Sequence, residues 1–330
     1  MNLAPWRAVD GAAARGLARA AFVATATLFA ISSCATLAGA AVARQGQVVM
    51  GTVLTVTVVA NDRDEAESLA AASIDEARRW DEALTIWRES GELARLNRAA
   101  GSGDIAVGSR LRFGLASMLE YAAETSGAFE PEVAILPDRG DPATVLRGIA
   151  HTLHLSPSTA SLEKGSALDP GAIGKGLALD AIVEMLEAHG IGSAFLDFGG
   201  SSQTAVGVSP GDPRGWTVAV ASLGATPHGV LRLRDESVST SVAGAADTKP
   251  ILDPRSRMPV PAPRLATVRC RSAAAADAWS TALVVLGPGG MAAARARSVE
   301  SLVEGGSGTA VSPGMGLIRG KPREKHAGKD

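Results

Sequence analysis

Aromatic residues are scarce in this sequence, and positive charge is not in excess. Only 4% of the 330 residues are aromatic, Tyr121 is the single tyrosine, and the net charge is −2. Proteins that bind single-stranded nucleic acid stack bases on aromatic side chains, and nucleic-acid binding in general relies on clustered Lys and Arg. The composition provides neither feature, so we expect no nucleic acid partner.

Long apolar runs are also missing from most of the chain. Residues 20–43 form an alanine-rich run without charge, and Arg7, Arg15 and Arg19 precede it. This run is rich in small residues, whereas a membrane-spanning helix needs about 20 predominantly apolar residues. A basic segment followed by a short apolar run is typical of an export signal. We therefore assign residues 1–43 to an export signal.

Two processing routes are open for this signal. Ile31-Ser32-Ser33-Cys34 resembles a bacterial lipobox, which would place a lipid anchor on Cys34, whereas Ala41-Val42-Ala43 offers a cleavage site near Ala43. Both routes predict an exported protein, either in the bacterial periplasm or lipid-anchored to the envelope membrane. Both also leave Cys270 without a partner, so we expect no disulfide and a buried, inert thiol.

The remaining chain combines helix-like and strand-like patterns. Residues 44–318 are long enough for one large domain or two packed ones, and the basic tail 319–330 is predicted to be disordered. Met50-Gly51 interrupts the first strand pattern as a kink or bulge. The mixture predicts an α+β fold. Helical patterns lie at 62–80, 107–125, 179–190 and 273–287, and strand patterns at 48–60, 194–198, 216–221, 229–233, 236–241 and 265–271.

The stretch from Leu168 to Ser202 contains a glycine-rich turn before a helix. Asp169-Pro170-Gly171 is a turn sequence, and the glycines and Ala172 after it leave backbone amides uncovered at the helix start. A helix N-terminus with Lys175 beside it suits a phosphate or diphosphate. The spacing fits neither the Walker loop nor the dinucleotide fingerprint. The alternative is an ordinary turn with a solvated lysine.

A possible cation site lies on the last predicted helix. Asp277 and Thr281 are four residues apart, so both side chains share one face of the helix. A carboxylate and a hydroxyl are oxygen ligands suited to a hard cation. The alternative for Thr281 is a hydrogen bond to its own helix backbone.

Seven short motifs lie in order along most of the chain after the signal. They are Met50-Gly51-Thr52, Gly91 to Asn97, Ser126 to Pro131, Asp169 to Asp180, Phe198-Gly199-Gly200, Asp253-Pro254-Arg255 and Ala276 to Thr281. Taken together, these motifs resemble the FAD:protein FMN transferase family, the ApbE-like flavin transferases of bacterial envelopes.

The resemblance implies a fold, a substrate and a reaction. The fold would consist of two interlocked α/β subdomains, with FAD in the cleft between them and Mg2+ on its diphosphate. The enzyme would move FMN from FAD to a threonine of an acceptor redox protein and release AMP. Met50, Trp87, Ala128, Phe129, Glu130, Asp169, Lys175 and Ile251 would line the FAD site, and the Ala172 carbonyl, Asp277 and Thr281 would hold the metal.

Several positions depart from the family pattern. Pro250 stands where the family usually has a histidine that acts as a base or orienter, and proline cannot move a proton. Val242 and Arg257 replace glycines. Asp247 and Lys249, just before Pro250, are candidates to substitute for the missing base. These departures motivate an alternative, a flavin-binding protein with weak or no transferase activity.

Overall fold

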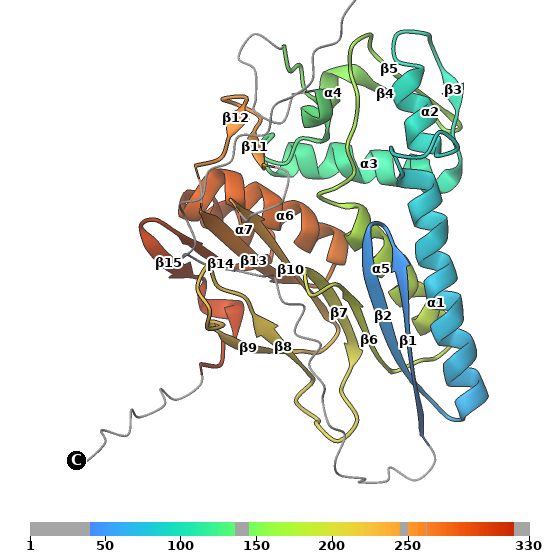
Figure 1. The fold of residues 1–330 in the computed structure, drawn as a ribbon, viewed down its shortest axis with the longest axis vertical. Coiled ribbons are helices and arrows are strands. Elements are labelled where there is room, and N and C mark those ends of the chain that lie inside the picture. The colour runs from blue at the N-terminus through green and yellow to red at the C-terminus, as the bar shows by residue number, and fades with distance from the viewer. Residues whose placement is uncertain (1–39, 136–144, 245–249, 262, 320–330) are drawn as a thin grey trace, which may run out of the picture. The chain divides into compact units, whose positions relative to one another are not determined.

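The computed structural model describes residues 40–135, 145–244, 250–261 and 263–319. Eight strands form one sheet in the order β1-β2-β6-β7-β10-β13-β14-β15 (Figure 1). Every neighbouring pair is antiparallel. The strands are Ala41–Val49 (β1), Thr52–Ala60 (β2), Ser193–Phe198 (β6), Ser202–Gly207 (β7), Glu236–Ala243 (β10), Arg264–Cys270 (β13), Glu300–Gly305 (β14) and Gly308–Val311 (β15).

Three helices cover one face of this sheet (Figure 1). Arg63–Leu84 (α1) packs on β1 and β2, Ala273–Leu286 (α6) packs on β10 and β13, and Gly174–Ala188 (α5) lies against both helices. The Asp62 side chain caps α1 by accepting from the Glu65 amide at 2.8 Å. The helical predictions at 62–80 and 273–287 are confirmed, and α1 continues to Leu84 as one helix.

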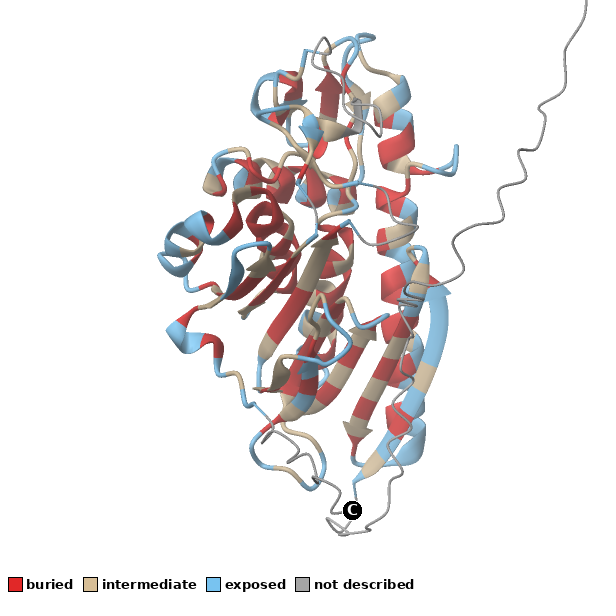
Figure 2. Ribbon diagram, turned by 60° about the vertical axis from the view of Figure 1, so that its left-hand side comes forward, coloured by how far each residue is buried: buried red, intermediate tan, exposed pale blue. Residues whose placement is uncertain are grey.

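The other face of the sheet carries a separate hairpin, Trp216–Val220 (β8) with Gly229–Leu233 (β9). Neighbouring residues on a strand point to opposite faces. In β13, Leu265 belongs to the cluster under this hairpin, whereas Ala266 belongs to the large cluster under the helices. Buried side chains therefore lie on both faces of the central strands. Figure 2 colours the buried residues of these strands red.

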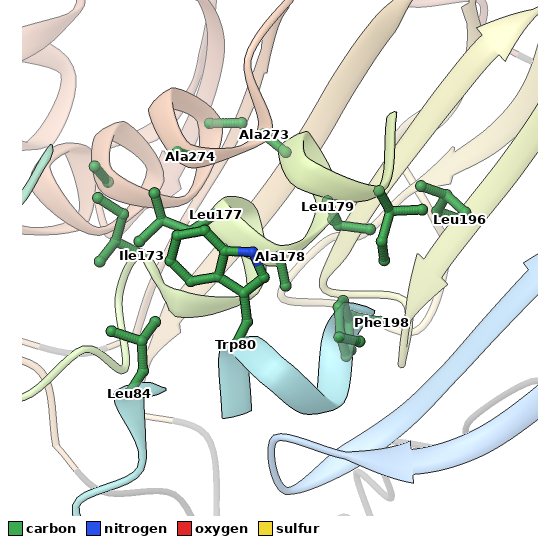
Figure 3. Close-up of a cluster of buried hydrophobic side chains, with 14 of the residues drawn as sticks. Trp80, Leu84, Ile173, Leu177, Ala178, Leu179, Leu196, Phe198, Ala273 and Ala274 are labelled. Carbon is green, nitrogen blue, oxygen red and sulfur yellow. The ribbon is translucent and has the colours of Figure 1, made fainter. Parts of the chain in front are cut away.

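A smaller subdomain packs against the helices. Its three-stranded antiparallel sheet has the order β3-β5-β4. One core cluster runs through both parts, since it contains Leu96 and Leu111 of the smaller part as well as Trp80 of α1. Trp80 and Leu84 lie beside Ile173 and Leu177 at the start of α5 (Figure 3). The predicted α+β fold with antiparallel sheets is thus confirmed. The smaller part consists of Glu92–Arg98 (α2), Ile105–Ala106 (β3), Ser109–Glu124 (α3), Ile149–Thr152 (α4), Leu153–Leu155 (β4) and Thr159–Leu162 (β5).

Met50-Gly51 is a hairpin turn and not a bulge. Met50 has φ 52° and Gly51 has φ 76°, as a two-residue turn between twisted strands requires. The strand before the turn, β1, begins at Ala41, so residues 41–43 are paired with Val58 to Ala60. Ala43 is buried. The sequence pattern missed β1 because its alternation merges with the apolar run that precedes it.

A second tight turn joins Leu252–Asp253 (β11) to Met258–Pro259 (β12). Arg257 there has φ 61°, and its amide donates to the Asp253 carbonyl at 2.7 Å. The left-handed region costs an L side chain about 1–2 kcal/mol. The resemblance described above leads one to expect glycine here, so the turn carries a less favourable residue than the expected one.

Two further expectations concern single features. Cys270 is half-buried, and burial raises the pKa of its thiol to about 12, in keeping with the expected inert thiol. Among the described residues, no helix has both the length and the apolar character needed to cross a membrane. The export signal up to residue 39, Cys34 within it, and the tail from residue 320 lie outside the described residues.

Candidate functional site

A cleft of about 230 Å3 opens where the β1–β2 turn, the end of α1 and the start of α5 meet. Four residues predicted to line the FAD site, Met50, Trp87, Asp169 and Lys175, line this cleft together. They come from three segments far apart in the sequence. The structure therefore brings half of the predicted ligand-binding set to one place.

Of the two basic side chains that line the cleft, one is in an ion pair and the other, within the described chain, is not. Arg88 lines it and is held by Asp81, with 3.0 Å between guanidinium nitrogen and carboxylate oxygen. Lys175 is half-buried on the cleft wall and has no ion-pair partner among the described residues. A lysine in this setting attracts an anionic ligand, because no carboxylate of the described chain already neutralises it.

The turn before α5 is held by its own hydrogen bonds. The Asp169 carboxylate accepts from the Gly171 amide at 2.8 Å, and the Gly174 amide donates to the Pro170 carbonyl at 2.8 Å. The Gly176 amide donates to Asp277 at 2.7 Å. The prediction that Gly174 and Gly176 leave their amides uncovered is therefore wrong, because the turn and a distant carboxylate satisfy them.

Asn97 of α2 fixes the segment that leads into this turn. Its side-chain amide donates to the Leu168 carbonyl, and its oxygen accepts from the Leu168 amide, both at 2.9 Å. This two-way contact ties the smaller subdomain to the residue directly before Asp169. This contact gives a structural role to Asn97, the last residue of the Gly91 to Asn97 motif.

Asp277 is the centre of a buried cluster of oxygen atoms. It is 3% exposed, and one carboxylate oxygen accepts from Ser202 at 2.7 Å and from Ser239 at 2.6 Å. Thr281 lies one turn further along α6, and its hydroxyl is 3.1 Å from the Ser241 hydroxyl. The predicted pair thus faces β7 and β10 across a layer of serines.

These serines were missed by the sequence interpretation, although a signal for them is present. Ser237, Ser239 and Ser241 alternate along β10, so all three point to the helix-covered face. Ser202 follows Gly199-Gly200 at the start of β7. Alternating hydroxyls in a strand destined for a core indicate a polar site on that face, since buried polar groups need partners.

Asp180 joins α5 to the start of α6. Its carboxylate accepts from the amides of Ala273 and Ala274 and from the hydroxyl of Ser272. Burial raises the pKa of the Asp180 carboxyl, and these hydrogen bonds work against that rise. Asp180, the last residue of the Asp169 to Asp180 motif, therefore caps the N-terminus of α6.

Four predicted FAD-site residues lie outside the cleft lining. Ala128 and Phe129 are each 2% exposed and belong to the hydrophobic core. The Glu130 carboxylate accepts from the amide of Ile149 at 3.0 Å, and burial raises its pKa. Ile251 is half-buried against the same core, directly before β11. Their assignment to the FAD site stays a prediction.

Three other predicted site residues can be placed only in part. Ala172 is half-buried in the turn before α5. Asp247 and Lys249, the suggested substitutes for the missing base, lie outside the described residues. Pro250 follows them and is exposed.

A second hollow, of about 300 Å3, lies beside β13 and β14. Its lining is rich in proline and glycine, and its one charged side chain, Arg264, donates to the carbonyl of Val284 at 2.7 Å. That arginine already caps the end of α6. Among the described residues of this lining, the only other side chain with a polar group is Ser307, whereas the cleft is lined by Lys175, Asp169 and Arg88, so the cleft is the candidate site.

The fold and this site define an α+β protein in which a half-buried lysine of a cleft, Lys175, lies next in the chain to a glycine whose amide binds the buried Asp277. Residues 50–303 match the model of the ApbE family, and the chain belongs to that family. The resemblance found in the sequence is confirmed.

Named relatives agree with this assignment. The chain is 31% identical over 262 residues to the FAD:protein FMN transferase of Treponema pallidum, which covers 66% of this chain and 68% of that protein. It is 26% identical over 271 residues to the FAD:protein FMN transferase of Klebsiella pneumoniae, which covers 72% of this chain and 77% of that protein. The flavin transferase ApbE from Vibrio cholerae has the same fold, with a TM-score of 0.70 and 20% identity over 83% of this chain and 97% of that one. The expectation of an enzyme of the flavin transferase class is confirmed.

Proposed function

We propose that this chain is an exported, Mg2+-dependent FAD:protein FMN transferase that modifies a threonine of an acceptor redox protein and releases AMP. The observation that carries the proposal is the contact between the Gly176 amide and Asp277. It places the predicted metal ligand within one residue of Lys175, the predicted diphosphate ligand. Both relatives that match in sequence bear the name of this activity.

The residues present fit Mg2+. A hard cation takes oxygen ligands, and the Asp277 carboxylate, the Thr281 hydroxyl and the Ala172 carbonyl are all oxygen donors. One Asp277 oxygen accepts from two serines and the other from one amide. A carboxylate offers about four lone-pair sites, so the oxygen facing Gly176 can still bind a cation. When bound, Mg2+ would neutralise charge on the diphosphate.

The chain's own residues would then position the substrate. Lys175 at the N-terminus of α5 holds the diphosphate through its ammonium and stabilises charge as the bond between the phosphates breaks. The acceptor threonine oxygen bonds to the FMN-side phosphorus, the bond from that phosphorus to the bridging oxygen breaks, AMP leaves with that oxygen, and the hydroxyl proton passes to solvent water. Positioning and charge neutralisation supply most of the catalysis in such transfers.

The cleft would hold part of FAD and not all of it. Its volume, about 230 Å3, is below the roughly 300–1,000 Å3 of typical small-molecule sites. Trp87 stands on its rim with 76% of its surface exposed. We place the diphosphate beside Lys175 and a ring system of FAD against Trp87, where an aromatic face can stack.

Replacing Lys175 with alanine is expected to weaken FAD binding about tenfold or more, because a charge-assisted contact to phosphate is worth about 1.5–3 kcal/mol. Calorimetric titration with FAD measures the change. Lys164→Ala is the matched control, since Lys164 is exposed and does not line the cleft. Equal affinity of the Lys175→Ala variant and the unchanged chain would remove Lys175 from the site.

Export is proposed with cleavage before β1. A cut after Ala43 would remove three paired residues from β1, including the buried Ala43, whereas a cut at Cys34 leaves the strand whole. We therefore favour a lipid-anchored N-terminus at Cys34. Mass spectrometry of the mature N-terminus is expected to show an acylated Cys34. A mature chain that begins at Arg44 would contradict this proposal.

The second candidate function is a flavin-binding protein with weak or no transferase activity. Pro250 favours it, because this exposed position directly before Ile251 offers neither a proton acceptor nor a backbone N–H. Binding needs Lys175 and the cleft, whereas transfer also needs a base. FAD binding without AMP release would support this candidate.

A further inference from the structure

The carboxylate of Asp180 receives three hydrogen bonds at the start of α6. The Ala273 amide donates to Oδ1 at 2.6 Å, while the Ala274 amide, at 3.0 Å, and the Ser272 hydroxyl, at 2.7 Å, donate to Oδ2. The first amides of a helix have no partner within the helix. Asp180, from a different helix, supplies that partner for two of them.

The exchange between the two helices is reciprocal. Asp277 of α6 accepts from the Gly176 amide in the first turn of α5, at 2.7 Å. Each helix thus contributes a carboxylate to the N-terminal amides of the other. The helices can come this close only because position 176 is glycine: a Cβ there would lie 2.3 Å from the Ala273 carbonyl oxygen.

We infer that Asp180 is a positioning residue, which sets α6, carrying Asp277 and Thr281, against α5, carrying Lys175. This inference rests on the proposed function, in which Asp277 and Thr281 bind the metal and Lys175 binds the diphosphate. Its physical content is a closed ring of contacts. Asp180 fixes the first turn of α6, the next turn carries Asp277, and Asp277 returns to α5 at Gly176.

Asparagine cannot replace Asp180 in this ring. Both carboxylate oxygens accept, so the amide NH2 of asparagine would face an N–H or O–H donor on one side. The first turn of α6 would lose an acceptor and loosen. Asp277 would then be presented less accurately both to Gly176 and to a metal.

The test compares Asp180→Asn with Glu76→Gln. Glu76 is also a buried carboxylate with two partners, since it binds Arg79 and Arg110, but it lies on α1 away from the cleft lining. Two measurements need no turnover: hydrogen exchange of the Gly176 amide in metal-free protein, and the MgCl2 concentration that gives half of the magnesium-induced rise in melting temperature. AMP release from FAD at varied MgCl2 is the third.

Asp180→Asn is expected to speed Gly176 exchange and to raise the magnesium midpoint, each about tenfold, the lower end of what loss of a ligand-orienting contact costs. Glu76→Gln is expected to lower the melting temperature and change neither quantity. Unchanged exchange or an unchanged midpoint in Asp180→Asn overturns the inference, as do equal shifts in Glu76→Gln.

Two further comparisons test the role of Asp180 if the variant does not fold or if the unchanged chain is inactive. If Asp180→Asn does not fold, Ser272→Ala removes one of the three donors and is expected to shift both quantities in the same direction by a smaller factor; no shift overturns the inference. If the unchanged chain releases no AMP from FAD, the proposed function fails, while Gly176 exchange and the magnesium-induced rise in melting temperature still decide the role of Asp180.

Discussion

Asp277→Asn is expected to reduce magnesium-dependent AMP release from FAD by at least about 100-fold. A bound cation contributes several kcal/mol of charge stabilisation to such a transfer, and each 1.36 kcal/mol is a factor of ten in rate. Asparagine has nearly the same volume as aspartate but lacks the charge that binds a hard cation. Turnover with FAD at saturating and at zero MgCl2 measures the effect.

The structure shows why asparagine is the better test than alanine. Alanine at 277 would leave three buried donors, from Gly176, Ser202 and Ser239, without an acceptor, and each costs about 1–3 kcal/mol. Asparagine can accept from the Gly176 amide with its oxygen and donate to the two serine hydroxyls, which can rotate to accept. The asparagine variant should therefore fold, and its loss of activity can be assigned to the metal.

Asp104→Asn is the matched control for this experiment. Its carboxylate also accepts from two hydroxyls, Ser161 at 2.6 Å and Thr159 at 3.4 Å, but it lies beside the small three-stranded sheet. We expect it to leave AMP release unchanged. Undiminished release in Asp277→Asn, or wild-type release that persists in a chelator, would show that the metal assignment is wrong.

Local patterns account for the parts of the site that the sequence predicted well. Asp277 and Thr281 lie on one face of α6 wherever that helix packs, because residues i and i+4 of an α-helix share a face. The turn from Asp169 to Gly171 is equally local. These features needed no knowledge of distant partners, and the structure contains both.

The parts that the sequence did not predict depend on long-range pairing. Ser202 and Gly176 both donate hydrogen bonds to Asp277, although they are 75 and 101 residues away in the sequence. No local sequence pattern predicts which strand will pack against a given helix. The Gly176 amide looked available for a ligand for the same reason, because its acceptor, Asp277, lies 101 residues later in the chain. The Gly174 amide is instead satisfied locally, by the Pro170 carbonyl.

The β1–β2 hairpin shows a different limit. A two-residue turn and a bulge both place Gly after an apolar residue, so the distinction depends on whether the preceding residues form a strand. Those residues, from Ala41, merge with an apolar signal-like run. From composition, residues 41–43 are assigned to the export signal. In the structure they belong to β1, because they pair with β2.

Pro250→His is expected to increase AMP release in the presence of a threonine-containing acceptor peptide by about tenfold or more, toward the roughly 100–10,000-fold that a positioned general base contributes. The increase should appear as the pH rises through about 6.5, because only the neutral imidazole accepts a proton. Turnover of both proteins with FAD and Mg2+ across pH 5.5–8.5, a range of about 1.5 units on either side of 7, measures it.

The position of Pro250 makes this substitution informative. It lies at the end of the chain segment that connects β10, whose Ser241 contacts Thr281, to β11. A histidine introduced there supplies a titratable group without changing the Asp277 cluster or the Lys175 turn. Pro250→Gln is the control, since it removes the same ring constraint and adds no base. An equal gain in Pro250→Gln would assign the effect to the backbone, and wild-type turnover of about 1 per second or more would show that another group of this chain already accepts the proton.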